Sequence, residues 1–237
     1  MPELLFAAYL VLVFPLQQLW RSLKPNQPDR AAEPKLPRYF RTIRGIAVML
    51  AVMVLLLWHS GRTAADVGLD MPVSVYGEWG LVLCAAIMLT SFVFSVAPQP
   101  SRARTAPNLQ AKIEAVDSIP RAARACLASL LMSLFIGVGW ELLYRGFLML
   151  VLPGVLGTVG AILATSIAYG VSHGYKNRGQ FVGSIISAFL FTMGYVLSHS
   201  LWWLIVLHLL APVYMGIMGY RVLKAAYKLT PSVAAVD

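Results

Sequence analysis

An acidic and a basic residue stand four positions apart inside a strongly apolar part of the chain. They are Glu141 and Arg145, in the stretch WELLYRG, which lies between CLASLLMSLFIGVG and FLMLVLPGVLG. On a helix, side chains at i and i+4 lie on one face, so the two can form an ion pair. Ionisable residues inside membrane-spanning segments are costly and mark functional sites by default. We therefore expect a functional carboxylate at Glu141; the alternative is an ion pair that only packs helices.

Two histidines offer partners for this carboxylate. His173 closes the segment AYGVSH, and His208 lies within WWLIVLHLLAP. One glutamate and two imidazoles are the ligands of a catalytic zinc site, which keeps a fourth position for water. The same three side chains also suit a metal-free mechanism, with the carboxylate as base and the imidazoles as donors to an oxyanion. Both alternatives predict water activated for peptide hydrolysis, and only the first requires zinc or another divalent metal, held by Glu141, His173 and His208.

The elements that carry these residues are predicted to be membrane-spanning helices. Of the 237 residues, 59% are hydrophobic and 12% are charged, whereas about 25% are charged in an average soluble domain. A helix needs about 20 apolar residues to cross a bilayer. The apolar runs predict an all-α, polytopic helical bundle and a single membrane domain over 1–237. It has about seven spans: 4–20, 42–58, 79–97, 125–150, 155–173, 181–198 and 201–220.

The basic residues are unevenly distributed between the loops. Of the 19 lysine and arginine residues, all but Arg62 and Arg145 fall in the first, third and fifth loops or in the tail. Because basic loops stay in the cytoplasm, we predict an outside N-terminus and a cytoplasmic C-terminus. The net charge of +9 then fits contact with the anionic lipid of the bilayer. No interleaved basic and aromatic patch suggests a nucleic-acid partner.

The predicted depths of the three candidate residues in the bilayer differ. Glu141 lies about 24 Å from the cytoplasmic start of its span at 1.5 Å per residue. His208 is also placed near mid-membrane, whereas His173 is placed near the cytoplasmic face. The three can meet only where helices tilt or break, or where the fourth span starts late. Glycines at positions 137, 139, 170 and 174 are the candidates for such a break.

Three segments of the chain, in this order, resemble the motifs of a known family. WELLYRGFLML, AYGVSHG and LIVLHLLAP are similar to the motifs of the CPBP intramembrane proteases, a family of CAAX proteases and bacteriocin-processing (Abi) proteins. The resemblance covers about residues 120–216, which we expect to hold the catalytic motifs. Residues 1–119 are then expected to supply N-terminal spans and cytoplasmic loops.

The resemblance implies roles for individual residues. The family pattern is Glu-Glu-x-x-x-Arg, then an aromatic residue with His four positions later, then His with Asn or Asp four later. Glu141 and Arg145 match the first motif, Tyr169 and His173 match the second with Tyr in place of the usual Phe, and His208 matches the third. By resemblance, Glu141 is base or ligand, Arg145 orients it, and the two histidines are metal ligands or oxyanion donors.

Two positions depart from the family pattern. Trp140 stands where the first Glu is expected, and Pro212 stands where Asn or Asp is expected. In the prenyl-protein proteases of the family the first Glu is thought to activate water, so this role would pass to Glu141. Proline also lacks an amide hydrogen, which frees a helical carbonyl near His208.

The resemblance implies an intramembrane metallo- or glutamate-type endopeptidase in the cell (inner) membrane. It would cut a membrane-associated protein or peptide near its C-terminus; prenylated tails, bacterial sorting tails and peptide precursors are candidate substrates. A second hypothesis, motivated by Trp140 and Pro212, is an inactive relative that binds a membrane partner as an immunity or chaperone-like protein. A third, a small transporter, lacks the matching halves with Gly/Pro-broken spans that transporters show.

Overall fold

The structure is a computed structural model that describes residues 1–24, 35–96 and 123–210. Over these ranges the chain forms helices and no strands. Six of these helices are long and apolar enough to cross a membrane. The predicted all-α, polytopic membrane fold is thereby confirmed.

The first three spans follow the predicted order with shifted ends. The first joins α1 (Pro2–Ala8), the π-helical segment η1 (Tyr9–Val13) and α2 (Phe14–Leu23). The second is α4 (Lys35–His59), which begins before the predicted start at residue 42, and the third is α5 (Val75–Val96). A proline in the first turn of α1 costs no hydrogen bond, because first-turn amides have no partner within the helix.

The later spans carry the candidate residues. The fourth joins α7 (Ala123–Trp140), the π-helical segment η3 (Glu141–Leu148) and α8 (Met149–Val151). The fifth is α9 (Pro153–Ser172) and the sixth is α10 (Arg178–Ser198), whose first turn is capped by the side chain of Asn177. Residues 202–210 are helical and begin the predicted span 201–220; its remaining residues lie outside the described ranges.

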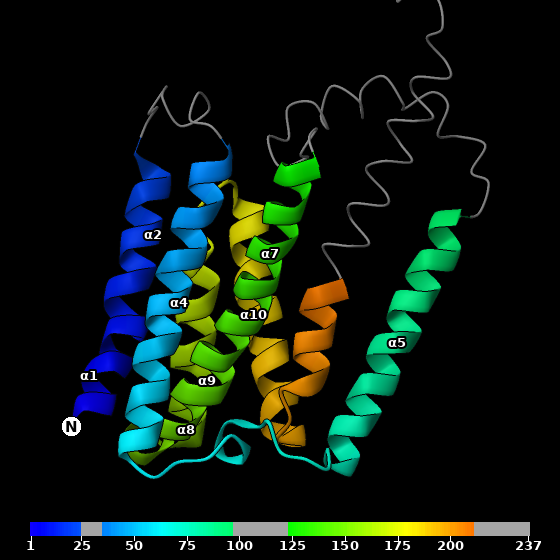
Figure 1. Cartoon of the computed structure of the whole chain (residues 1–237). Helices are drawn as coiled ribbons and strands as arrows, with labels where there is room; N and C mark the ends of the chain where they lie inside the picture. The colour runs from blue at the N-terminus through cyan, green and yellow to red at the C-terminus, as the bar shows by residue number, and fades with distance from the viewer. Residues whose placement is uncertain (25–34, 97–122, 211–237) are drawn as a thin grey trace, which may run out of the picture.

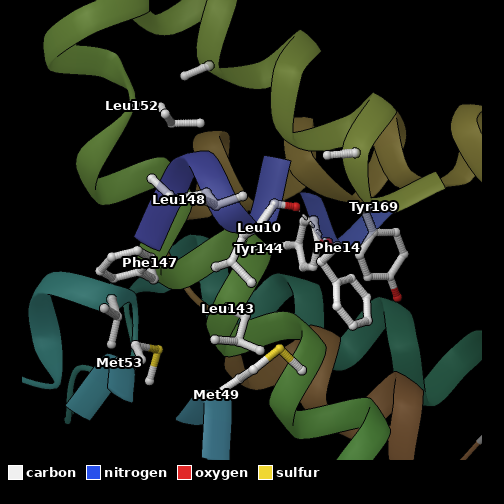
Figure 2. Close-up of a cluster of buried hydrophobic side chains, with 14 of the residues drawn as sticks. Leu10, Phe14, Met49, Met53, Leu143, Tyr144, Phe147, Leu148, Leu152 and Tyr169 are labelled. Carbon is white, nitrogen blue, oxygen red and sulfur yellow. Dashed lines mark hydrogen bonds between the residues drawn. The ribbon is translucent and has the colours of Figure 1, made fainter. Parts of the chain in front are cut away.

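The segment η3 lies at the centre of the helical bundle. Every residue of η3 except Leu142 is buried. Its apolar side chains form a cluster with those of η1, α2 and α4, as Figure 2 shows for Leu10, Phe14, Met49 and Met53. Around this core α9 packs against α2 and α10, and α4 packs against α7 (Figure 1). Single π-helical turns inside α-helices often occur at functional sites.

A loop between α4 and α5 supports η3 from one end of the bundle. It contains the 3₁₀ turn η2 (Ala65–Val67), and a Cβ added at Gly146 of η3 would lie 3.1 Å from the Cβ of Val67. The carboxylate of Asp66 shapes this loop, since its Oδ2 accepts from the backbone N–H of Thr63 (2.7 Å) and from its hydroxyl (2.9 Å). Together these two hydrogen bonds lower the pKa of Asp66.

Two helix contacts depend on the absence of a side chain. A Cβ at Gly170 would lie 2.7 Å from the Cα of Ile185, so α9 and α10 touch almost backbone to backbone. A Cβ at Gly137 would lie 2.9 Å from the Cβ of His208, so α7 and the helix 202–210 are equally close. Small residues allow such packing between membrane helices. The second contact brings His208 beside the helical turn that carries Glu141.

A break in α9 sets the depth of its functional end. Gly157 has φ 68° and ψ 166°, which an L side chain rarely adopts, and regular helix resumes after it. Tyr169 then lies about 16 Å along the regular helix that follows Gly157. Glu141 lies roughly 15 Å from the end of α8, so Tyr169 and Glu141 reach a similar depth in the bundle. The break therefore lies at position 157 and not at the predicted glycines 137, 139 or 170, whose helices continue. Gly174, with φ 70°, forms the turn after His173.

Candidate active site

The predicted ion pair is present and completely buried. Nη1 of Arg145 donates to Oε1 of Glu141 at 2.9 Å, and both side chains are 0% exposed. The guanidinium has two further contacts: Nη2 donates to the carbonyl of Ala188 on α10 (3.3 Å), and Cζ lies 3.9 Å from the ring centroid of Tyr169. Three helices thus hold the cation, so that it fixes one oxygen of the carboxylate.

His208 completes the surroundings of this oxygen. Its Nδ1 lies 3.3 Å from Oε1 of Glu141 and 3.0 Å from the carbonyl oxygen of Leu204. Its Nε2 lies 3.4 Å from the hydroxyl of Tyr169. The structure therefore brings together Glu141, Arg145, His208 and Tyr169 from the first, second and third motifs.

His173 lies one helical turn after Tyr169, just beyond the last residue of α9. Its ring packs edge-on against Tyr169 with centroids 4.8 Å apart, and its Nδ1 lies 3.0 Å from the Tyr169 carbonyl oxygen. Among the described residues no hydrogen bond or ion pair links His173 to Glu141 or His208, and Tyr169 contacts both histidines. Loss of water around the imidazole lowers the pKa of His173, opposed by the hydrogen bond to the Tyr169 carbonyl, so the neutral form is favoured.

Trp140 fills an aromatic cluster beside the ion pair. Its ring centroid lies 5.1 Å from that of Phe14, 5.3 Å from that of Tyr144 and 6.3 Å from that of Tyr169. Tyr144 extends the cluster toward the first span, because its hydroxyl donates to the carbonyl of Leu10 at 3.1 Å (Figure 2). The first span therefore forms one wall of the site, which no sequence motif indicated.

Several buried polar atoms of this region have no hydrogen-bond partner among the described residues. They include Oε2 of Glu141, Nε of Arg145, and the hydroxyls of Thr165 and Ser166. Buried polar groups without partners are uncommon and occur at functional sites. Thr165 and Ser166 precede Tyr169 by four and three positions and so share its face of α9. Sequence reasoning missed them, although two hydroxyls in an apolar helix one turn before Tyr169 were the available signal.

The arrangement of these donors does not fit a metal site. A catalytic zinc needs three side chains that converge on one point. In the part of the chain that the structure describes, no three His, Cys, Asp or Glu side chains gather in this way. Oε1 of Glu141 and Nδ1 of His208 face each other instead of a common centre. We therefore derive no step through a metal.

Comparison with known proteins supports a relationship for the C-terminal part of the chain. No curated protein and no solved structure matches the chain. Residues 122–213 match the family described as Rce1-like, type II CAAX prenyl endopeptidase Rce1-like. This segment contains every site residue named above except Leu10 and Phe14 of the first span. It also contains Pro212, which lies outside the described residues. The predicted resemblance is thereby confirmed, and residues 122–213 are similar to the Rce1-like CAAX endopeptidase family.

Proposed function

We propose that this protein is an intramembrane endopeptidase that hydrolyses a peptide bond near the C-terminus of a membrane-associated protein or peptide. The observation that carries the proposal is the state of the Glu141 carboxylate. Oε1 is held by Arg145 and His208, whereas Oε2 is buried and has no hydrogen-bond partner among the residues that the structure describes. A carboxylate fixed by one oxygen and open at the other is suited to accept a proton from water. The match to a protease family over residues 122–213 supports this reaction class.

The proposed reaction uses Glu141 as base and then as acid. Oε2 accepts a proton from water, the hydroxide oxygen adds to the carbonyl carbon of the substrate, and an oxyanion forms. The carbon–nitrogen bond then breaks, and the proton on Glu141 passes to the leaving amine. Nδ1 of His173 faces a backbone carbonyl, so in the neutral imidazole the proton sits on Nδ1. Its Nε2 is then an acceptor that can hold the second hydrogen of the water.

Membrane orientation forms part of the proposal. In Figure 1 the end of α2, the start of α4 and the turn between α9 and α10 lie at the same end of the bundle. These segments carry the basic residues Lys24, Lys35, Lys176 and Arg178. We place this end in the cytoplasm by the positive-inside rule, with the N-terminus outside. His173 then lies at the cytoplasmic face, and membrane-impermeant labelling of single cysteines at positions 61 and 176 tests the assignment.

The experiment that tests the activity compares C-termini in the membrane proteome of the host. Cells that carry the natural protein are compared with cells that carry Glu141→Gln, which keeps the shape of the side chain and removes the base. Glu78→Gln, at an exposed glutamate in the first turn of α5, is the matched control. We expect at least one protein whose C-terminus is longer in the Glu141→Gln cells only. Identical C-termini in all three strains, at equal expression and insertion, would refute the protease assignment.

A second candidate function is a catalytically inactive protein that binds a membrane partner. The observation that favours it is Trp140, whose indole packs among aromatic rings at the position where the family pattern has a glutamate. An immunity or chaperone-like role would need the fold and not the base. A host phenotype that survives both Glu141→Gln and His173→Ala would support this function and exclude hydrolysis.

A further inference from the structure

The contacts of His208 determine where its proton sits. Nδ1 faces two acceptors, the carbonyl oxygen of Leu204 at 3.0 Å and Oε1 of Glu141 at 3.3 Å. An unprotonated Nδ1 would set its lone pair against both of these oxygens. A neutral His208 therefore carries its hydrogen on Nδ1, and its Nε2 is an acceptor. The only hydrogen-bond partner of this Nε2 among the described residues is the hydroxyl of Tyr169, at 3.4 Å.

Tyr169 is held so that its hydroxyl can reach this atom. Its side chain is buried, and its ring is packed by Trp140, Tyr144 and His173. The guanidinium of Arg145 lies over the ring face at 3.9 Å. A cation over an aromatic face is attracted by the negative charge density of the ring. The cation in turn draws charge away from the phenol oxygen, which makes the hydroxyl a stronger donor. A phenylalanine would preserve all these ring contacts and lose only the donor.

We propose that Tyr169 is a positioning residue, whose hydroxyl fixes the orientation of His208 and through it that of the Glu141 carboxylate. The Tyr169 hydroxyl lies within hydrogen-bond reach of Nε2 of His208, at 3.4 Å, and Nδ1 of His208 lies 3.3 Å from Oε1 of Glu141 in an ion-pair contact. Oε1 then faces His208 and Arg145 together, whereas Oε2 has no hydrogen-bond partner among the described residues. The effect of Tyr169 on the rate rests on the proposed hydrolytic function. The contact between Tyr169 and His208 does not depend on that function.

The test uses two tyrosines that differ in what their hydroxyls contact. Tyr169→Phe removes the donor to His208. Tyr144→Phe is the matched control, because Tyr144 is equally buried beside Tyr169 and its hydroxyl donates to the carbonyl of Leu10. Both variants are prepared as full-length protein in lipid with ¹⁵N-labelled histidine. The chemical shifts of the two ring nitrogens report the tautomer and the hydrogen bonds of His208, and a His208→Gln sample assigns its signals.

We expect natural protein and Tyr144→Phe to show one His208 tautomer, protonated at Nδ1, with Nε2 accepting a hydrogen bond. In Tyr169→Phe the Nε2 signal should move to that of an unbonded nitrogen. Cleavage of a substrate that depends on Glu141 should fall about tenfold or more in Tyr169→Phe, and less than about twofold in Tyr144→Phe. An unchanged His208 spectrum in Tyr169→Phe would overturn the inference.

The two proposals fail in different ways. If Glu141→Gln has no effect on any C-terminus while the His208 spectrum responds to Tyr169→Phe, the proposed function is wrong and the positioning contact is real. If Glu141→Gln abolishes cleavage while Tyr169→Phe cleaves at the natural rate, the hydrolytic function stands and Tyr169 has no role in it.

Discussion

Nδ1 of His208 lies 3.3 Å from Oε1 of Glu141, although the two residues belong to different helices that are distant in sequence. The same oxygen accepts from Arg145 at 2.9 Å. Both contacts thus fall on one carboxylate oxygen, and the other has no hydrogen-bond partner among the described residues. The following predictions test the contacts that produce this asymmetry.

Removal of Arg145 should strongly destabilise the protein. Arg145→Leu leaves a carboxylate that is 0% exposed without its cation, and the loss of one partner of a buried pair costs about 3–5 kcal/mol. Thermal unfolding in detergent should show a large drop in midpoint. The double variant Glu141→Leu, Arg145→Leu should recover most of this drop and remain inactive, because an apolar pair replaces the buried charges. If Arg145→Leu alone were as stable as the natural protein, water would have to reach the Glu141 carboxylate.

Trp140 should act through the volume and shape of its ring. Trp140→Phe keeps aromatic contact with Phe14 and Tyr144, so stability and cleavage should stay near natural values. Trp140→Ala removes the ring and should cost about 3–5 kcal/mol, as other large-to-small core changes do. Unfolding midpoints and cleavage rates of the two variants provide the measurement. A stable but inactive Trp140→Phe would instead assign the indole N–H a part in the reaction.

Gly137 should be required for the contact between Glu141 and His208. In Gly137→Ala the new methyl would meet the Cβ of His208 at 2.9 Å, so the helix 202–210 must shift. Displacement of a reacting group by about 1 Å can reduce the rate about 100-fold. The control is Gly183→Ala in α10, where nothing lies within 4 Å of the added carbon. Cleavage should fall in the first variant only, and equal rates in both would show that the helix tolerates the shift.

The loop between α4 and α5 should respond to acid through Asp66. Its pKa is lowered by the hydrogen bonds from the backbone N–H and the side chain of Thr63. A carboxyl group with a lowered folded-state pKa stabilises the fold above its unfolded-state pKa, and this contribution disappears as the pH falls through the folded-state value. Asp66→Asn should therefore lower the unfolding midpoint at neutral pH and have no effect below the folded-state pKa of Asp66. A midpoint difference that is the same at every pH would contradict this assignment.

Sequence reasoning could predict what depends on hydrophobic length and local spacing. Apolar runs predicted the order of the six spans found among the described residues, and the i, i+4 spacing of Glu141 and Arg145 predicted their ion pair. The proximity of His208 followed from motif resemblance. That resemblance also placed Tyr169 and His173 in one motif, and their ring centroids lie 4.8 Å apart.

Other features depend on tertiary packing and left no clear trace in the sequence. The break at Gly157 was missed, because a single glycine in an apolar run does not reveal a positive φ. The π-helical register of η3 was equally hidden, since it changes which amide meets which carbonyl without altering composition. The contacts of Phe14 with Trp140 and of Leu10 with Tyr144 join residues that lie far apart in the chain, so no local pattern could indicate them.

The packing inside residues 122–213 depends on the first helix. It supplies the carbonyl of Leu10 and the ring of Phe14 to a cluster whose other members all belong to residues 122–213. The matched segment is therefore not a portable module that keeps its inner surface when it is joined to a different N-terminal helix. A change at position 14 can reach the ring of Tyr169 through Trp140 while every motif residue stays the same.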